Sequence, residues 1–195
     1  EPDLPVVYNG LDMAAMPFVA EPDDYLAIVG RMIPTKGIAE AIRITKAAGE
    51  RLHIVGDVTS YVPWTQAYFD EQVAPHVDGD QIMYTSEMPN AEVLALVSHA
   101  KGFLFPLQGE EPFGLTVLEA MACGTPVIAM PRGAMPELID DGTSGYLVDD
   151  EQAAIDAIAK LGALDRATVR GHVEARFTHQ RMVTAYESLY AQVTG

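Results

Sequence analysis

Short apolar runs alternate with amphipathic helical stretches along this chain, and this alternation limits the possible fold more than any other feature. The apolar runs lie at residues 25–30, 52–56, 81–84, 102–106, 127–130 and 145–148. Runs of this length are typical of strands buried on both faces of a sheet. Because helical patterns separate them, the sequence predicts right-handed βαβ units. We therefore predict an α/β fold, a Rossmann-like parallel sheet with helices on both faces.

The helical patterns and several smaller features complete this prediction. Helices are expected at residues 38–48, 65–73, 91–98, 114–122, 136–139, 151–161, 165–176 and 179–193. Gly49 is expected to end the first of them at its C′ position, and Asn90 and Asp165 are expected to cap later ones. A short strand is expected at Val6–Tyr8. Trp64 is expected in a loop, where packing is favoured over the alternative, an exposed stacking role.

Composition argues against several classes of partner. The 195 residues, 49% of them apolar, suit one domain with a substantial core. The net charge of −16 argues against nucleic acid or an anionic membrane surface as a partner. A single cysteine fits a reducing compartment, so we expect a cytoplasmic location, and no apolar run reaches membrane-spanning length. No Met opens the sequence, and we expect the chain to be part of a longer protein.

Residues 104–129 predict a strand, a tight polar loop, a short helix and a second strand. Glu111 and Glu119 lie at the two ends of the loop and helix, with seven residues between them. Pro112–Gly114 breaks the chain ahead of the helix and leaves backbone N–H groups unpaired, which makes an anion site. Two carboxylates beside an anion site fit a ligand with both phosphate and hydroxyl groups, such as a sugar nucleotide.

Arg31 and Lys36 flank the loop between the first strand and the first helix. The guanidinium fork suits phosphate oxygens, and the ammonium is a mobile point charge. They could also be ordinary surface cations, but the chain has only 12 basic residues, which favours phosphate binding. Ligands of parallel sheets bind beyond the carboxyl ends of the strands. The polar loops expected there are residues 31–36, 56–57, 85–89 and 108–116.

Other polar side chains support narrower expectations. Glu119 could accept hydrogen bonds from vicinal ribose hydroxyls, or it could be a solvated carboxylate on the helix face. Thr116 could add a hydroxyl to the phosphate site, or it could face the sheet. Asp78–Asp80 has the Asp-x-Asp letters of metal-dependent sugar transfer, but Asp-Gly predicts a turn. The five histidines lack ligand-like spacing, so no metal or cofactor is expected. Cys123 is expected to be a core residue rather than a nucleophile.

Five motifs point together to one family. They are EEPFGLTVLEAMACGTPVIA (Glu110–Ala129), VGRMIPTKG (Val29–Gly37), RGAMPELIDDGTSGYLV (Arg132–Val148), RFTHQRMVTAYESLY (Arg176–Tyr190) and YNGLD (Tyr8–Asp12). With them the chain resembles, over nearly its whole length, the C-terminal, donor-binding half of family-4 glycosyltransferases with the GT-B fold. The first motif is the most specific of the five.

The resemblance implies an enzyme of the hexosyltransferase type that transfers a sugar, with retention and without a metal, from a nucleotide-diphosphate donor. Residues 1–195 would form the donor-binding domain, with 1–20 as the inter-domain connection and 178–195 as a terminal helix. Arg31, Lys36 and Glu111 would be the catalytic residues, the cations on the diphosphate and Glu111 on the transferred sugar. The expected donor-binding residues are Gly30, Gly56, Thr85, Met88, Phe113, Gly114, Leu115, Thr116 and Glu119, with Glu119 on the ribose and residues 85–88 near the base.

The chain departs from the family pattern in two ways. Gly109 stands where relatives often carry a bulky residue, so the pocket wall is expected to differ there. The N-terminal acceptor domain is missing, and it would be supplied in cis or by a separate chain. We therefore expect this chain alone to bind a donor without efficient transfer.

Three alternatives remain open from the residues. Glu111 could be a covalent nucleophile in a double displacement, as in retaining glycosidases. The site could also belong to a sugar-nucleotide epimerase, or to a nucleotide-binding or interaction module without activity of its own. The base, the sugar, the acceptor and the oligomeric state leave no side-chain signature in this sequence.

Overall fold

Six parallel strands form one sheet in the computed structural model, which describes residues 5–58 and 62–194. The strands are β1 (Leu26–Val29), β2 (Leu52–Val55), β3 (Ile82–Thr85), β4 (Gly102–Phe105), β5 (Val127–Ala129) and β6 (Gly145–Leu147). Their order in the sheet is β3-β2-β1-β4-β5-β6. The order reverses between β1 and β4, the switch point at which doubly wound sheets bind ligands. Each predicted apolar run is a strand, so the Rossmann-like sheet is confirmed.

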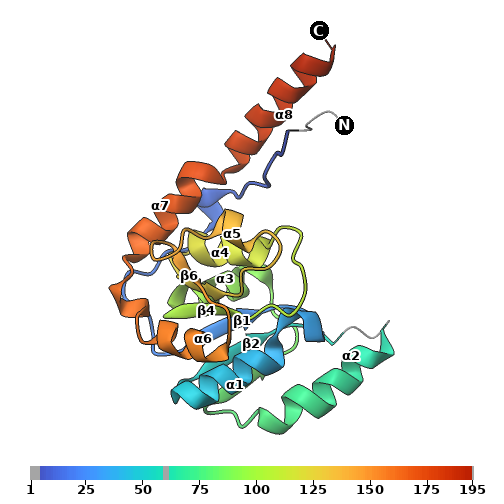
Figure 1. Ribbon diagram of the computed structural model, residues 1–195, viewed down its shortest axis with the longest axis vertical. Helices are drawn as coiled ribbons and strands as arrows, with labels where there is room; N and C mark the ends of the chain where they lie inside the picture. The colour runs from blue at the N-terminus through green and yellow to red at the C-terminus, as the bar shows by residue number, and fades with distance from the viewer. Residues whose placement is uncertain (1–4, 59–61, 195) are drawn as a thin grey trace.

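The helices are α1 (Ile38–Ala48), α2 (Pro63–Tyr68), α3 (Asn90–His99), α4 (Leu115–Ala122), α5 (Met135–Leu138), α6 (Glu151–Ile158), α7 (Arg166–Arg176) and α8 (His179–Thr194). Short helical turns lie at Met13–Ala15, Pro34–Lys36, Phe69–Val73, Ala74–His76 and Leu161–Ala163. Figure 1 shows α8 extending away from the sheet, beside the N-terminal segment. Within the described ranges, no helix is both long enough and apolar enough to cross a bilayer.

Helices cover both faces of the sheet. Side chains alternate between the faces along a strand, so Phe103 and Phe105 of β4 pack in a cluster with buried residues of α3, α4, α5 and α7. Leu104, between them, packs on the other face with buried residues of α1 and α6. Both faces of the sheet are therefore covered and shielded from solvent, which explains why the strands are continuous apolar runs.

Two of the predicted helix ends are confirmed and one is wrong. Gly49 ends α1 in the left-handed conformation, and the carboxylate of Asp165 caps α7 by accepting from the N–H of Thr168 at 3.0 Å. Asn90 is not the cap of α3 but its first residue. The N-cap is the preceding Pro89, whose backbone is not helical, with φ of −55° and ψ of 141°.

Two further expectations are corrected. Val6–Tyr8 is not a strand. The backbone pairing of the N-terminal segment lies further on, at Leu11, which forms an isolated bridge with Thr178 just before α8. The N–H of Leu11 donates to Phe177 O at 2.8 Å, and the N–H of His179 donates to Leu11 O at 3.0 Å. Trp64 lies in α2 rather than in a loop, and 54% of it is exposed, so it does not pack in the core.

Candidate functional site

The loops that follow β1 and β4 meet at the switch point of the sheet. The ammonium of Lys36, on the first loop, forms an ion pair with the carboxylate of Glu111, on the second, and both side chains are mostly buried. The N–H of Gln108 donates to Thr35 O at 3.0 Å, which joins the same two loops through their backbones. The structure therefore brings a predicted phosphate-binding cation and a predicted sugar-binding carboxylate into direct contact.

Lys36 is held where the start of α1 meets the end of β4. Its ammonium lies 5.6 Å from the centre of the Phe105 ring, and a Cβ at Gly30 would lie 3.6 Å from its side chain. Gly37 follows with φ of 74°, and a Cβ there would lie 2.0 Å from the carbonyl oxygen of Pro106. Only glycine permits this approach, so the backbone fixes where Lys36 emerges. Arg31 is exposed on the same loop and, among the described residues, forms no ion pair.

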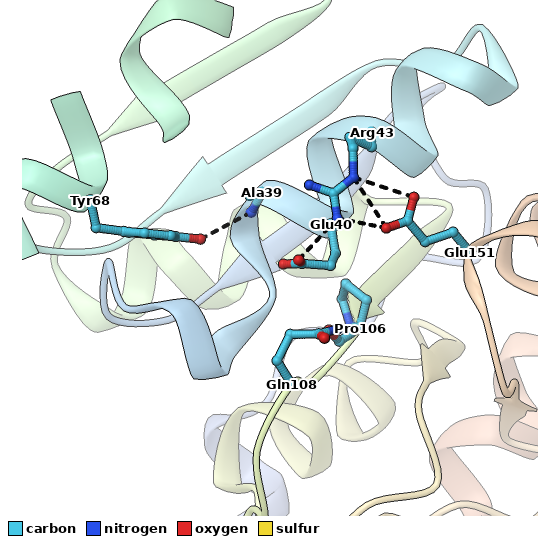
Figure 2. A network of polar contacts seen from close by, with 7 residues as sticks. All are labelled: Ala39, Glu40, Arg43, Tyr68, Pro106, Gln108 and Glu151. Atoms are coloured by element: carbon cyan, nitrogen blue, oxygen red, sulfur yellow. Dashed lines mark hydrogen bonds and ion pairs between the residues drawn. The ribbon is translucent and has the colours of Figure 1, made fainter. Parts of the chain in front are cut away.

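Polar contacts fix the first turns of α1 against neighbouring elements (Figure 2). The N–H of Ala39 donates to the hydroxyl of Tyr68 at 3.2 Å, which satisfies one of the unpaired N–H groups at the helix start. Arg43 donates to Glu40 at 2.9 Å and to Glu151 at 2.6 Å, which ties α1 to α6. The loop that carries Lys36 is thus attached to a rigid helix.

The loop after β5 clamps the Glu111 loop from the other side. The N–H of Ala134 donates to Glu111 O at 3.0 Å, and the N–H of Gly133 donates to the carboxylate of Glu110. Gly133 has φ of 56°, and a Cβ there would lie 2.2 Å from Glu111 O. Arg132 donates to Gln108 O at 3.0 Å. The sequence interpretation missed this third loop, although it follows a predicted strand at the carboxyl edge of the sheet.

Helix α4 starts beside Glu111 and leaves N–H groups free. Gly114 is its N-cap, with φ of 95°, and within the described residues no side chain caps the helix. Val117 and Leu118 donate to Gly114 O, but the N–H groups of Leu115 and Thr116 donate to no described protein atom. The start of α4 therefore presents unpaired N–H groups, as the sequence predicts, and anion binding there remains a prediction.

Glu119 lies in α4 in a partly buried position. Burial raises the pKa of its carboxyl group above the usual range. Among the described residues, none forms an ion pair with the Glu119 carboxyl group or donates a hydrogen bond to it. A carboxylate kept without a protein partner is available to bind hydroxyl groups of a ligand.

The strand ends next to β1 bring together three more predicted residues. The N–H of Gly56 donates to Thr85 O at 3.1 Å, and a Cβ at Gly56 would lie 1.8 Å from Gly30 O. Gly30, Gly56 and Thr85 therefore lie side by side at the ends of β1, β2 and β3. Met88 lies further along the loop after β3, and no described contact joins it to them.

Phe113 lies beside the N-terminal segment, an arrangement that the sequence did not indicate. The ring centres of Tyr8 and Phe113 are 6.3 Å apart, and the Tyr8 hydroxyl donates to Glu137 at 2.6 Å. The predicted inter-domain connection therefore contacts the loop that precedes α4.

Two alternative readings of single residues are resolved by contacts. The carboxylate of Asp78 accepts from the N–H groups of Asp80 and Ile82, at 3.0 and 2.9 Å, so this segment forms the predicted turn. Cys123 is fully buried, which raises the pKa of its thiol to about 12 and confirms its place in the core. Within residues 5–58 and 62–194, no group of His, Cys, Asp and Glu side chains could hold a metal ion.

A pocket of about 880 Å³ lies at the opposite, amino edge of the sheet, between residues 18–22 and the turn Leu161–Ala163. Lys101, one of several charged residues that line it, is held by Asp24, at 2.6 Å, and by Glu50. The cations and carboxylates of the switch point do not line this pocket.

The fold and the site together define a doubly wound α/β domain whose candidate ligand loops lie at the β1–β4 switch point. The sequence matches the family of glycosyl transferases group 1 over residues 23–163, and the chain belongs to this family. This membership confirms the resemblance that the motifs predicted.

Three relatives illustrate the match. Glycogen synthase of Mycobacterium tuberculosis is 29% identical over 195 residues, which cover 95% of this chain and 45% of that protein. D-inositol 3-phosphate glycosyltransferase of Corynebacterium efficiens is 30% identical over 183 residues, 87% of this chain and 43% of that protein. The solved structure of sucrose-phosphate synthase from Thermosynechococcus elongatus superposes with a TM-score of 0.82 at 26% identity, over 96% of this chain and 52% of that one. This chain thus spans about half the length of the relatives it matches.

Proposed function

We propose that this chain is the donor-binding domain of a retaining glycosyltransferase that uses a nucleotide-diphosphate sugar without a metal ion. The observation that carries the proposal is the Lys36–Glu111 ion pair, which lies at the switch point beside the free N–H groups of α4. A cation and a helix start suit the diphosphate, and the adjacent carboxylate suits the hydroxyls of the sugar.

The proposed chemistry is cleavage of the bond between the anomeric carbon and the diphosphate oxygen. Negative charge develops on the departing diphosphate, and Arg31, Lys36 and the start of α4 stabilise it. These groups are already in place, so little reorganisation is needed as the bond breaks. The acceptor hydroxyl then bonds to the anomeric carbon on the face from which the diphosphate leaves, and its proton passes to the departing diphosphate oxygen.

The remaining assignments belong to the same proposal. Glu119 binds the ribose hydroxyls, the free N–H groups of α4 bind phosphate, and the ends of β2 and β3, with Gly56, Thr85 and Met88, lie toward the base. The acceptor domain is supplied in cis or by a separate chain, and the location is cytoplasmic. The matched relatives are named for glycogen and for D-inositol 3-phosphate, which supports sugar transfer but not one acceptor.

A product analysis tests this proposal. Protein that includes an acceptor domain is incubated with nucleotide-diphosphate sugars and candidate acceptors, with and without a chelator, and the anomeric configuration of the product is read by NMR. We expect retention and no loss of rate on chelation. Inversion or a chelator-sensitive rate would contradict the mechanism, and an epimerised donor in reactions without acceptor would favour the epimerase.

A further inference from the structure

Arg132 lies at the carboxyl edge of the sheet, immediately beyond β5. The strands there are ordered β1, β4 and β5. Lys36 approaches the Glu111 loop from the β1 side, where it pairs with Glu111, and Arg132 approaches this loop from the β5 side, where it donates to Gln108 O. The Glu111 loop is therefore flanked by positive charge on both sides.

Hydrogen bonds place the Arg132 guanidinium close to the loop that carries Lys36. Arg132 Nη1 donates to Gln108 O at 3.0 Å, and the N–H of Gln108 donates to Thr35 O at 3.0 Å. Thr35 precedes Lys36 in the sequence. One residue of the central loop thus separates Arg132 from the phosphate-binding loop.

Among the described residues, most of the Arg132 guanidinium has no partner. The bond to Gln108 O uses one of the five N–H donors of an arginine, and the side chain is exposed. Arg132 forms no ion pair within the described part of the chain, although acidic residues outnumber basic ones by 28 to 12. By contrast, Arg43 pairs with two carboxylates and Arg170 with one.

We propose that Arg132 is a third cation of the donor site and that its free donors bind a phosphate oxygen of the nucleoside diphosphate. This inference rests on the proposed function and adds a residue to it. The hydrogen bond to Gln108 orients the planar fork, whose remaining N–H groups match phosphate geometry. Gly133, next in the chain, holds Arg132 in place because its backbone packs directly on Glu111.

Calorimetric titration of this chain with UDP, GDP and ADP tests the inference. The variants are Arg132→Gln, which keeps a donor for Gln108 O but loses the charge, and Arg132→Lys, which keeps the charge. Arg51→Gln is the matched control, because Arg51 is exposed, forms no ion pair among the described residues and precedes β2 at the opposite edge of the sheet. Lys36→Ala reports separately on the diphosphate site of the proposed function.

We expect Arg132→Gln to weaken the best-bound diphosphate about tenfold, a difference of about 1.4 kcal/mol. Arg132→Lys should retain most of the affinity, Arg51→Gln should bind as the unchanged chain does, and the Arg132→Gln defect should shrink at high salt because screening weakens charge interactions. Normal binding by Arg132→Gln while Lys36→Ala is weakened would overturn this inference alone. Equal losses in Arg132→Gln and Arg51→Gln would also overturn it, and no binding by the unchanged chain would overturn it together with the proposed function.

Discussion

Lys36 and Glu111 lie 75 positions apart in the sequence and form a mostly buried ion pair across the switch point of the sheet. The pair joins the β1 loop, which bears cations, to the β4 loop, which leads into α4. In the proposed donor complex the two groups bind different parts of the donor: Lys36 binds the diphosphate and Glu111 binds the sugar. Without donor, each holds the other in position.

Loss of either phosphate cation should slow transfer strongly. In protein that includes the acceptor domain, we expect Lys36→Ala or Arg31→Ala to reduce turnover about 100- to 1,000-fold, the usual effect of removing one group that stabilises transition-state charge. Steady-state rates with saturating donor measure this. Lys160→Ala, an exposed cation outside the site, should leave turnover unchanged, and near-normal rates in both site variants would remove the phosphate assignment.

Glu119→Gln should stabilise the protein while weakening nucleotide binding. Burial raises the pKa of Glu119 in the folded state above its usual value of 4.5. Between that value and the raised one, the unfolded chain ionises first, so the folded state loses stability as the pH rises. Relative to Glu119→Gln, the unchanged protein should therefore lose stability through this window, as chemical unfolding at several pH values would show.

The ribose assignment of Glu119 has a separate measurement. If Glu119 accepts from the ribose hydroxyls, Glu119→Gln should reduce affinity for the ribonucleotide about tenfold and reduce the preference over its 2′-deoxy form. Glu187→Gln, on the exposed side of α8, is the control for both experiments. An unchanged preference for ribose would place the ribose elsewhere.

Gly133→Ala should move the loop that carries Glu111. Alanine at φ of 56° is strained, and its Cβ would lie 2.2 Å from Glu111 O, so the backbone must shift. Gly142→Ala is the matched control, since φ there is 76° but no atom lies within 4 Å of the added Cβ. We expect Gly142→Ala to cost about 1 kcal/mol of unfolding free energy with normal nucleotide affinity. Gly133→Ala should lower the unfolding free energy further and should also weaken nucleotide binding. Identical behaviour of the two variants would show that the contacts of residues 132–134 with the Glu111 loop do not position the site.

Glu111 should not become covalently attached to the sugar. The proposed mechanism gives it hydrogen bonds to hydroxyls of the donor sugar, whereas double displacement makes it a nucleophile. With a slow fluorinated donor, intact-mass spectrometry of the enzyme should show no added sugar. A glycosyl adduct that disappears in Glu111→Gln would establish the nucleophilic role instead.

The sheet and the two main site loops were predictable because their signals are local. Strands buried on both faces are continuous apolar runs, and the carboxyl-edge rule places Lys36 and Glu111 at one edge once the strands are known. The family motifs added roles for Glu119 and for residues of α4. These roles remain predictions.

The remaining features depend on contacts that no local pattern encodes. Val6–Tyr8 has strand-forming side chains, but it lies beside α8 rather than at a sheet edge. Trp64 is exposed, although tryptophan is usually well buried. The sequence did not indicate the role of the loop after β5, because Arg132 and Gly133 contact mainly backbone atoms of the Glu111 loop. Applying the carboxyl-edge rule to β5 would have identified them as candidates.

The most direct test of the central claim is the affinity of this chain for UDP, GDP and ADP, measured by calorimetric titration with and without Lys36→Ala. The Lys36–Glu111 site predicts that at least one of the three diphosphates binds and that Lys36→Ala weakens it at least about tenfold. Binding of none of them, or binding that Lys36→Ala leaves unchanged, would contradict a diphosphate site between β1 and β4.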